Sequence, residues 1–220
     1  MVCSLAWKLI SDPGIGLMMA KALAANGAAR VYILGRREDV LESATRESGF
    51  TNVIIPIVAD VTSKDSLAAA VQQISSQTGF VNVLVANAGQ GGPRHRFTTQ
   101  TSLKDFQSEL WNVDFSDYLG VFAANTVGIW YTVVAFLGLL DAGNKKGNVA
   151  QTSQIITTGS VSGFNRKSPG NFAYSQSKAA ATHLTKQLAT VLVPYGIRSN
   201  MIAPGRTYPL IMGHISLGEI

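Results

Sequence analysis

Short and almost uninterrupted apolar runs recur along the chain, and segments with helical periodicity separate them. The runs cover residues 29–36, 53–61, 81–89, 153–163 and 196–205. Apolar runs of this length are typical of strands that are covered on both faces. Strands of that kind occur mostly in parallel sheets with helices on each side, so the pattern predicts a buried parallel sheet.

The segments between these runs repeat their apolar positions with the period of a helix. They cover residues 16–26, 37–48, 63–78, 103–110, 120–140 and 172–193, whereas residues 90–101 show no periodicity and are expected to form a surface loop. Strand–helix alternation predicts an α/β protein with a doubly wound parallel sheet. A chain of 220 residues without a convincing linker is expected to form one domain, residues 1–220.

Composition and charge limit the class of partner. The chain is 46% hydrophobic and 14% charged, which is typical of an ordered globular protein. Its net charge of +5 is spread without a Lys/Arg block, which favours a small-molecule ligand over nucleic acid. The single Cys3 cannot form an internal disulfide and fits a cytoplasmic location. The histidines are isolated from one another, so we expect no metal site.

The uncharged segment 120–140 is long enough to cross a membrane. However, Asn125 and several glycines interrupt it, and it falls within the strand–helix pattern. We therefore expect a buried or subunit-interface helix and no membrane span.

The segment 13–28 opens like a helix that binds a dinucleotide. Gly14, Ile15 and Gly16 precede its apolar part. Glycines at such a position let backbone N–H groups approach a pyrophosphate, which the positive end of the helix dipole attracts.

Two arginines follow the second predicted strand. Sites for NAD carry a carboxylate there, which binds the ribose 2′-hydroxyl, whereas an arginine accommodates the 2′-phosphate of NADP. Arg36 and Arg37 therefore favour NADP, although the same residues could merely begin a helix. Asp60 ends the next strand, where it could meet the adenine. Asn87 and Gly89 end the fourth strand, beside the expected ribose.

The segment Tyr-Ser-Gln-Ser-Lys places Tyr174 and Lys178 on one face of a helix. A lysine ammonium close to a phenol favours the phenolate, which would make Tyr174 a usable general acid or base. An ordinary exposed pair is the alternative. Ser160 follows a strand and offers a hydroxyl to a substrate carbonyl, and Asn125 needs a partner if it is buried.

As an ordered set, these motifs resemble those of the short-chain dehydrogenases/reductases over about residues 14–205. The set is Gly14-Ile15-Gly16, Asp60, Asn87-Ala88-Gly89, Asn125, Ser160, Tyr174-x-x-x-Lys178 and Pro204-Gly205. The resemblance implies a Rossmann-type sheet and an oxidoreductase that uses NAD or NADP. Together with Arg36 and Arg37, it makes NADP (NADPH) the expected cofactor. It also implies a carbonyl or alcohol substrate, which we expect to be small or medium and apolar. The helices 120–140 and 172–193 correspond to those through which family members form homodimers and homotetramers.

The resemblance also implies a role for each residue. Tyr174 would donate the proton, and Lys178 would assist it and bind the nicotinamide ribose. Ser160 would polarise the carbonyl, and Asn125 would help to hold a proton-relay water. Tyr174 and Lys178 thus join the cofactor-binding set Gly14, Ile15, Gly16, Arg36, Arg37, Asp60, Asn87 and Gly89.

Both ends of the chain depart from the family pattern. Leu9 and Ile10 stand where the family has Thr-Gly, and Asp12 adds a negative charge near the expected pyrophosphate. Residues 1–10 could supply the first strand, although a central position would bury Lys8. The segment after Gly205 is short for the family. A second hypothesis therefore stays open: an impaired or truncated member that acts as a nucleotide-binding or interaction protein.

Overall fold

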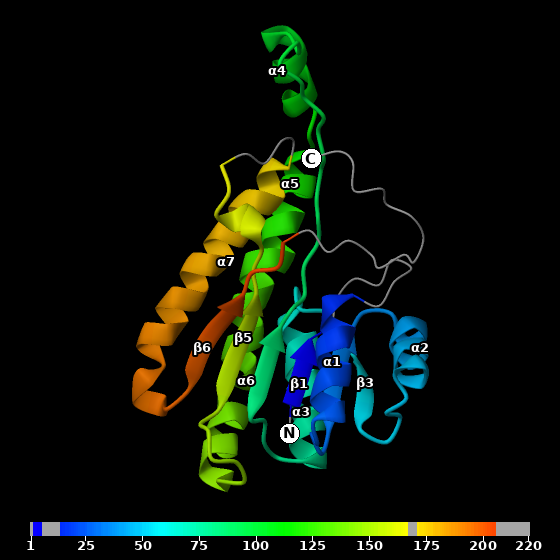
Figure 1. The fold of residues 1–220 in the computed structure, drawn as a ribbon, viewed down its shortest axis with the longest axis vertical. Helices are drawn as coiled ribbons and strands as arrows, with labels where there is room; N and C mark the ends of the chain where they lie inside the picture. The colour runs from blue at the N-terminus through cyan, green and yellow to red at the C-terminus, as the bar shows by residue number, and fades with distance from the viewer. Residues whose placement is uncertain (1, 6–13, 167–170, 206–220) are drawn as a thin grey trace, which may run out of the picture.

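A computed structural model of the chain describes residues 2–5, 14–166 and 171–205. Its centre is a six-stranded sheet in the order β3-β2-β1-β4-β5-β6 (Figure 1). All neighbouring strands are parallel. The strands are β1 (Val2–Leu5), β2 (Val31–Gly35), β3 (Ile54–Val58), β4 (Val83–Ala86), β5 (Gln154–Thr158) and β6 (Arg198–Ile202). The predicted doubly wound parallel sheet is therefore confirmed.

Strand β1 lies in the middle of the sheet, between β2 and β4. Its Val2 pairs with Val31 on one side and with Val83 on the other. The described part of this strand ends at Leu5, and Lys8 lies outside the described residues, so its expected burial stays a prediction. Since the chain proceeds outward in opposite directions from β1 and β4, the strand order reverses here. Ligands of such sheets bind at the carboxyl ends of the strands at this point.

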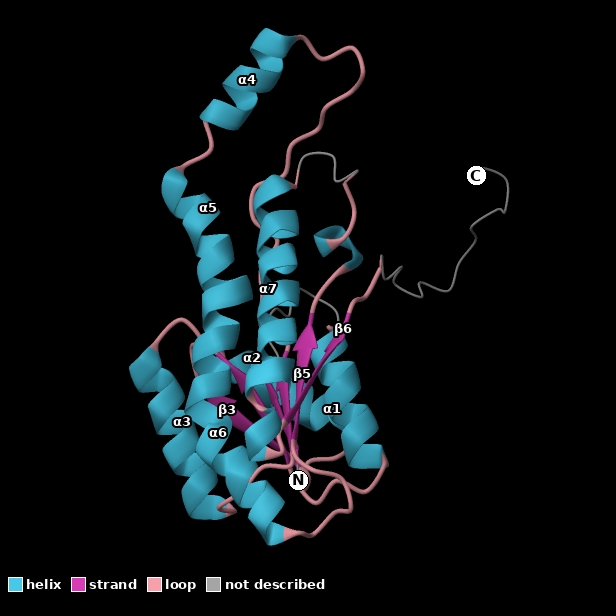
Figure 2. Ribbon diagram, turned by 90° about the vertical axis from the view of Figure 1, so that its left-hand side faces the viewer, coloured by secondary structure: helices cyan, strands magenta, loops and turns pink. Residues whose placement is uncertain are grey.

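Helices cover both faces of the sheet (Figure 2). On one face α1 (Ile15–Ala25) and α2 (Glu38–Ser48) form a core with Val31 and Ile33 of β2. On the other face α3 (Lys64–Gln77), α6 (Gly128–Lys146) and α7 (Phe172–Val191) contribute to a second core, which also contains Tyr32 and Leu34 of β2. Because successive residues of β2 enter different cores, the strand reads as a continuous apolar run.

The predicted helix 120–140 is part of a longer helical run, so its predicted bounds were wrong. The run consists of α5 (Phe115–Phe122), a π-helical turn η1 (Ala123–Val127) and α6. It continues until Gly147, which adopts a left-handed conformation with φ of 60°. This run, 115–146, is apolar and long enough to cross a membrane, but half of its most apolar window is buried inside the fold. Core helices pass the same test, so its composition is weak evidence for a membrane span.

The loop expected at residues 90–101 is confirmed, since these residues form neither helix nor strand. The next element, α4 (Leu103–Trp111), begins after Ser102, whose side chain accepts a hydrogen bond from the Asp105 amide. No residue of α4 is buried by the described part of the chain, and Figure 1 shows this helix extending away from the sheet. Short 3₁₀ turns, η2 (Val161–Gly163) and η3 (Val193–Tyr195), flank α7.

Two glycines of α6 provide a matched test of how closely this helix approaches the sheet. A Cβ at Gly143 would overlap the Val81 carbonyl oxygen and lie 2.8 Å from Ser153 Oγ, whereas a Cβ at Gly138 meets nothing within 4 Å. We expect Gly143→Ala to reduce the free energy of unfolding by about 1–3 kcal/mol because the helix must move away. Gly138→Ala should leave it unchanged or raise it by up to about 1 kcal/mol. Urea denaturation measures both, and equal effects would contradict the packing described.

Candidate active site

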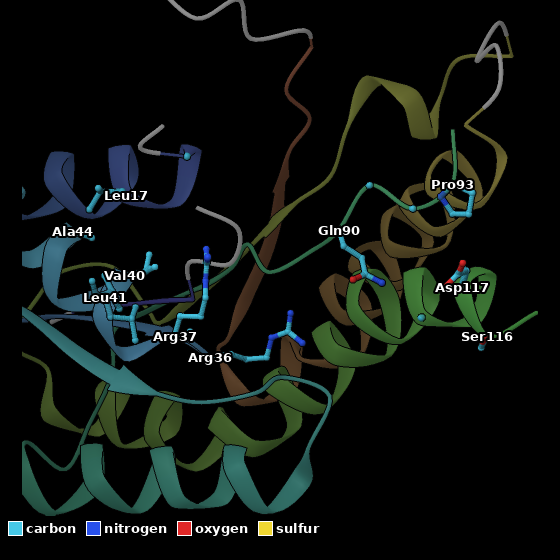
Figure 3. Close-up of a pocket in the computed structure, with 16 residues that line it drawn as sticks. Leu17, Arg36, Arg37, Val40, Leu41, Ala44, Gln90, Pro93, Ser116 and Asp117 are labelled. Atoms are coloured by element: carbon cyan, nitrogen blue, oxygen red, sulfur yellow. The ribbon is translucent and has the colours of Figure 1, made fainter. Parts of the chain in front are cut away.

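A cleft of about 790 Å³ opens at the carboxyl ends of the central strands (Figure 3). Arg36 and Arg37, which connect β2 to α2, line one side, together with Gly14. Gln90 and Asp117 lie on the opposite side. The volume is that of a typical cofactor or substrate site.

The N-terminus of α1 adjoins this cleft. Gly14 is the N-cap residue with extended backbone, and Ile15 and Gly16 are the first residues of the helix. The amides at the start of a helix suit an anionic group. The departures Leu9, Ile10 and Asp12 lie outside the described residues.

A smaller cleft of about 230 Å³ is lined by Arg36, Asp60 and Gly89, among others. The Asp60 carboxylate accepts hydrogen bonds from the Thr62 amide (2.8 Å) and the Thr62 hydroxyl (2.6 Å), which fix the turn after β3. Asn87, half-buried, comes directly after β4 and two residues before Gly89. The structure thus brings both strand ends to one edge of the sheet.

Asn125 is fully buried within the π-helical turn η1. Its Oδ1 accepts a hydrogen bond from the Gln90 amide (2.7 Å). Its Nδ2 donates to the Gln90 carbonyl (2.9 Å) and to Ser177 Oγ (2.9 Å). A Cβ on Gly89 would lie 2.7 Å from Asn125 Oδ1 and 3.5 Å from Lys178 Nζ, so only glycine fits there without displacement. Asn125 therefore joins the loop after β4 to α7.

Lys178 has a buried side chain and is only 4% exposed. Its Nζ donates to the Thr158 carbonyl (2.7 Å) at the end of β5 and lies 5.9 Å from the centroid of the Tyr174 ring. Desolvation by burial lowers the pKa of Lys178 from 10.5 to about 8. The phenol and the ammonium share one face of α7, as the sequence spacing predicts.

Ser160 is buried where β5 leads into η2, and its Oγ accepts a hydrogen bond from the Ser162 amide (3.2 Å). The next amide, that of Val161, donates to the Pro204 carbonyl (3.1 Å). A Cβ on Gly163 would lie 2.9 Å from the Lys178 carbonyl carbon, so η2 packs directly on α7. The Ser160 hydroxyl is thereby held on an element that contacts the Tyr174–Lys178 helix.

Sequence reasoning missed three residues that hold this arrangement. Gln90 and Thr158 act through backbone groups, which no side-chain pattern reveals. Ser177 lies inside the Tyr-Ser-Gln-Ser-Lys segment, but only the packing of η1 on α7 shows that it bonds to Asn125.

Comparison with known proteins agrees with this geometry. Residues 11–217 match the model of the family described as short chain dehydrogenase. The chain belongs to the short-chain dehydrogenase/reductase family. The short-chain dehydrogenase/reductase PhomF of Diaporthe leptostromiformis is 49% identical over 197 residues, which cover 89% of this chain and 67% of that protein.

Solved structures of the family have the same fold. The NADP active-site complex of RhlG from Pseudomonas aeruginosa is 26% identical with a TM-score of 0.73, and covers 89% of this chain and 69% of that one. Xylitol dehydrogenase with NAD⁺ bound is 27% identical with a TM-score of 0.73, and covers 93% and 69%. This short-chain dehydrogenase/reductase is therefore a Rossmann-type oxidoreductase of a family that uses nicotinamide cofactors and acts on small molecules.

The burial of Lys178 predicts a dependence of stability on pH. Because the pKa is lower in the folded than in the unfolded chain, the unfolded chain binds more protons between about pH 8 and 10.5. Stability should rise with pH across this window and be lowest below it. Relative to Lys178→Met, the wild type should gain about 2 kcal/mol in free energy of unfolding between about pH 7 and about pH 9.5.

Urea denaturation at both pH values measures this difference. Lys186→Met is the matched control, because Lys186 is exposed on the same helix. The difference in free energy of unfolding between wild type and this variant should be the same at both pH values. A difference between wild type and Lys178→Met that does not change with pH would contradict the described burial.

Proposed function

We propose that this protein is an NADP(H)-dependent oxidoreductase that reduces a carbonyl, or oxidises the corresponding alcohol, on a small or medium apolar substrate. The observation that carries the proposal is the buried Lys178 ammonium, held between the Thr158 carbonyl and the ring of Tyr174. Among the described residues, no carboxylate forms an ion pair with this ammonium. Such an amine is costly to bury, so a structural role alone is a poor explanation for it.

The residues around the large cleft fit a dinucleotide phosphate. Arg36 and Arg37 bring two cations to its wall, and the N-terminus of α1 adjoins it. We assign the arginines to the 2′-phosphate and Gly14, Ile15 and Gly16 to the pyrophosphate. Asp60 is assigned to the adenine, and Asn87 and Gly89 to the ribose. Solved relatives with NADP and with NAD⁺ both exist, so the proposed preference for NADP rests on the two arginines.

When bound, NADPH supplies the hydride for carbonyl reduction. The Tyr174 hydroxyl would donate a proton to the substrate oxygen, and the Ser160 hydroxyl would donate a hydrogen bond to the same atom. Lys178 would stabilise the resulting phenolate and bind the ribose. Both N–H donors of the Asn125 amide already have protein partners. We therefore propose that this side chain holds the site together and that it does not itself donate to a relay water.

We also propose assembly into a homodimer or homotetramer. Val127, Trp130 and Val134 lie on the long helical run and expose 42–47% of their surface in the described chain. Apolar side chains gathered on one helix are commonly covered by a partner. A monodisperse monomer in light scattering would contradict this proposal. The cytoplasmic location stays a prediction.

The choice of cofactor follows from the arginines. We expect NADPH to bind more tightly than NADH, and the double variant Arg36→Ala/Arg37→Ala to lose this preference. Each lost charged contact should cost about 1.5–3 kcal/mol, or about 10- to 100-fold in Kd. Fluorescence titration of both cofactors measures the effect. Arg46→Ala is the control, because Arg46 is an exposed arginine of α2. Equal affinity of the wild type for the two cofactors would refute the assignment.

The acid role of Tyr174 is tested by removing its hydroxyl alone. Tyr174→Phe should reduce turnover by about 10²–10⁴-fold, because the ring remains and only the proton donor is lost. The affinity for NADPH should remain nearly unchanged. NADPH oxidation with a panel of ketones, aldehydes and quinones measures turnover. A variant as active as the wild type would exclude the role, and a wild type that binds NADPH without turnover would favour the nucleotide-binding hypothesis.

A further inference from the structure

A serine hydroxyl lies at the centre of the hydrogen bonds that join α7 to the rest of the site. Ser177 comes between Tyr174 and Lys178 in the sequence and is fully buried. Its Oγ accepts a hydrogen bond from Asn125 Nδ2 (2.9 Å) and donates to the Tyr174 carbonyl (2.7 Å). With 0% of its surface exposed, Ser177 cannot reach a substrate, so any effect it has on the reaction must act through its neighbours.

A second hydrogen bond joins the same residue to η1. Thr126 Oγ1 donates to the Ser177 carbonyl (3.0 Å). Two consecutive residues of the π-helical turn, Asn125 and Thr126, therefore donate to one residue of α7. Single π-helical turns inside α-helices commonly occur at functional sites. The extra residue of such a turn changes the direction of the side chains that follow it.

The hydrogen bonds form a continuous path across the site. The backbone of Gln90 bonds to Asn125, which bonds to Ser177, which bonds to the carbonyl of Tyr174. The path begins next to Gly89, where even one added carbon would displace Asn125. It therefore sets the position of the first turn of α7 relative to the loop after β4.

We propose that Ser177 is a positioning residue: its hydroxyl and carbonyl hold Tyr174 and Lys178 in register with Asn125, Thr126 and the loop after β4. The inference rests on the proposed function of Tyr174 and Lys178. In this proposal Ser177 fixes the position of the proton donor, Tyr174, and Tyr174 itself transfers the proton. A displacement of about 1 Å in such a group can reduce turnover by about 10²-fold.

The first test compares two buried hydroxyls of α7. Ser177→Ala should reduce kcat by about 10- to 100-fold with little change in the KM of the carbonyl substrate, because orientation and not binding is lost. Ser177→Thr retains the hydroxyl and should recover most of the kcat. Thr185→Val is the matched control: Thr185 is buried, and among the described residues its hydroxyl bonds only within α7, to the Ala181 carbonyl (2.9 Å). Its kcat should equal that of the wild type.

The second test asks whether the two bonds between η1 and α7 act together. Thr126→Val removes the bond to the Ser177 carbonyl and keeps the shape of the side chain. If both bonds hold the same turn, the reductions in kcat from Thr126→Val and Ser177→Ala should be non-additive in the double variant. The proposal would be overturned if the fold reduction in kcat of the double variant equalled the product of the two single reductions. An unchanged kcat in Ser177→Ala would also overturn it.

A third measurement separates this inference from the proposed function, because it does not depend on turnover. Hydrogen exchange followed by mass spectrometry should show faster exchange of residues 172–178 and 88–91 in Ser177→Ala, and no such change in Thr185→Val. If the wild type lacks activity but this pattern appears, the proposed function fails and the positioning contact stands. If exchange in both segments matches the wild type, the positioning role is wrong.

Discussion

The hydrogen bonding of one buried amide constrains the whole site. Asn125 cannot be buried without partners for both its donors and its acceptor, and those partners are Gln90 and Ser177. One partner follows a central strand and the other belongs to α7, so satisfying the amide fixes the distance between them. The positions of Gly89, Tyr174 and Lys178 depend on that distance.

Close backbone packing makes this arrangement possible. Gly89 leaves room for Asn125 and Lys178, Gly163 lets η2 contact α7, and Gly143 lets α6 approach the sheet. In each case the neighbour would overlap with or crowd a Cβ atom. The parallel sheet also contributes to the site, because the carboxyl ends of its strands all lie at the edge where the clefts open.

The cations of the open cleft and the cation of the Tyr174–Lys178 helix have different surroundings. Arg36 and Arg37 line the open cleft, where a cation can meet an anionic ligand. Lys178 is instead buried, with a backbone carbonyl as its nearest acceptor, and its pKa falls to about 8 for that reason. A cation that is costly to bury and lies beside a phenol is typical of reactive sites, which supports the proposed catalytic role of Tyr174 and Lys178.

The sequence by itself determined the sheet, the layers of helices and which side chains are proposed to be reactive. Continuous apolar runs report burial on both faces, and the spacing of Tyr174 and Lys178 places them on one helical face, because both features are local. The tertiary structure decided the π-helical turn at Asn125, the extension of that helix to residues 115–146, and the roles of Gln90, Thr158 and Ser177. Those features depend on contacts between residues far apart in the chain, several of them made by backbone groups that every residue carries. No pattern of side chains along the sequence can therefore report them.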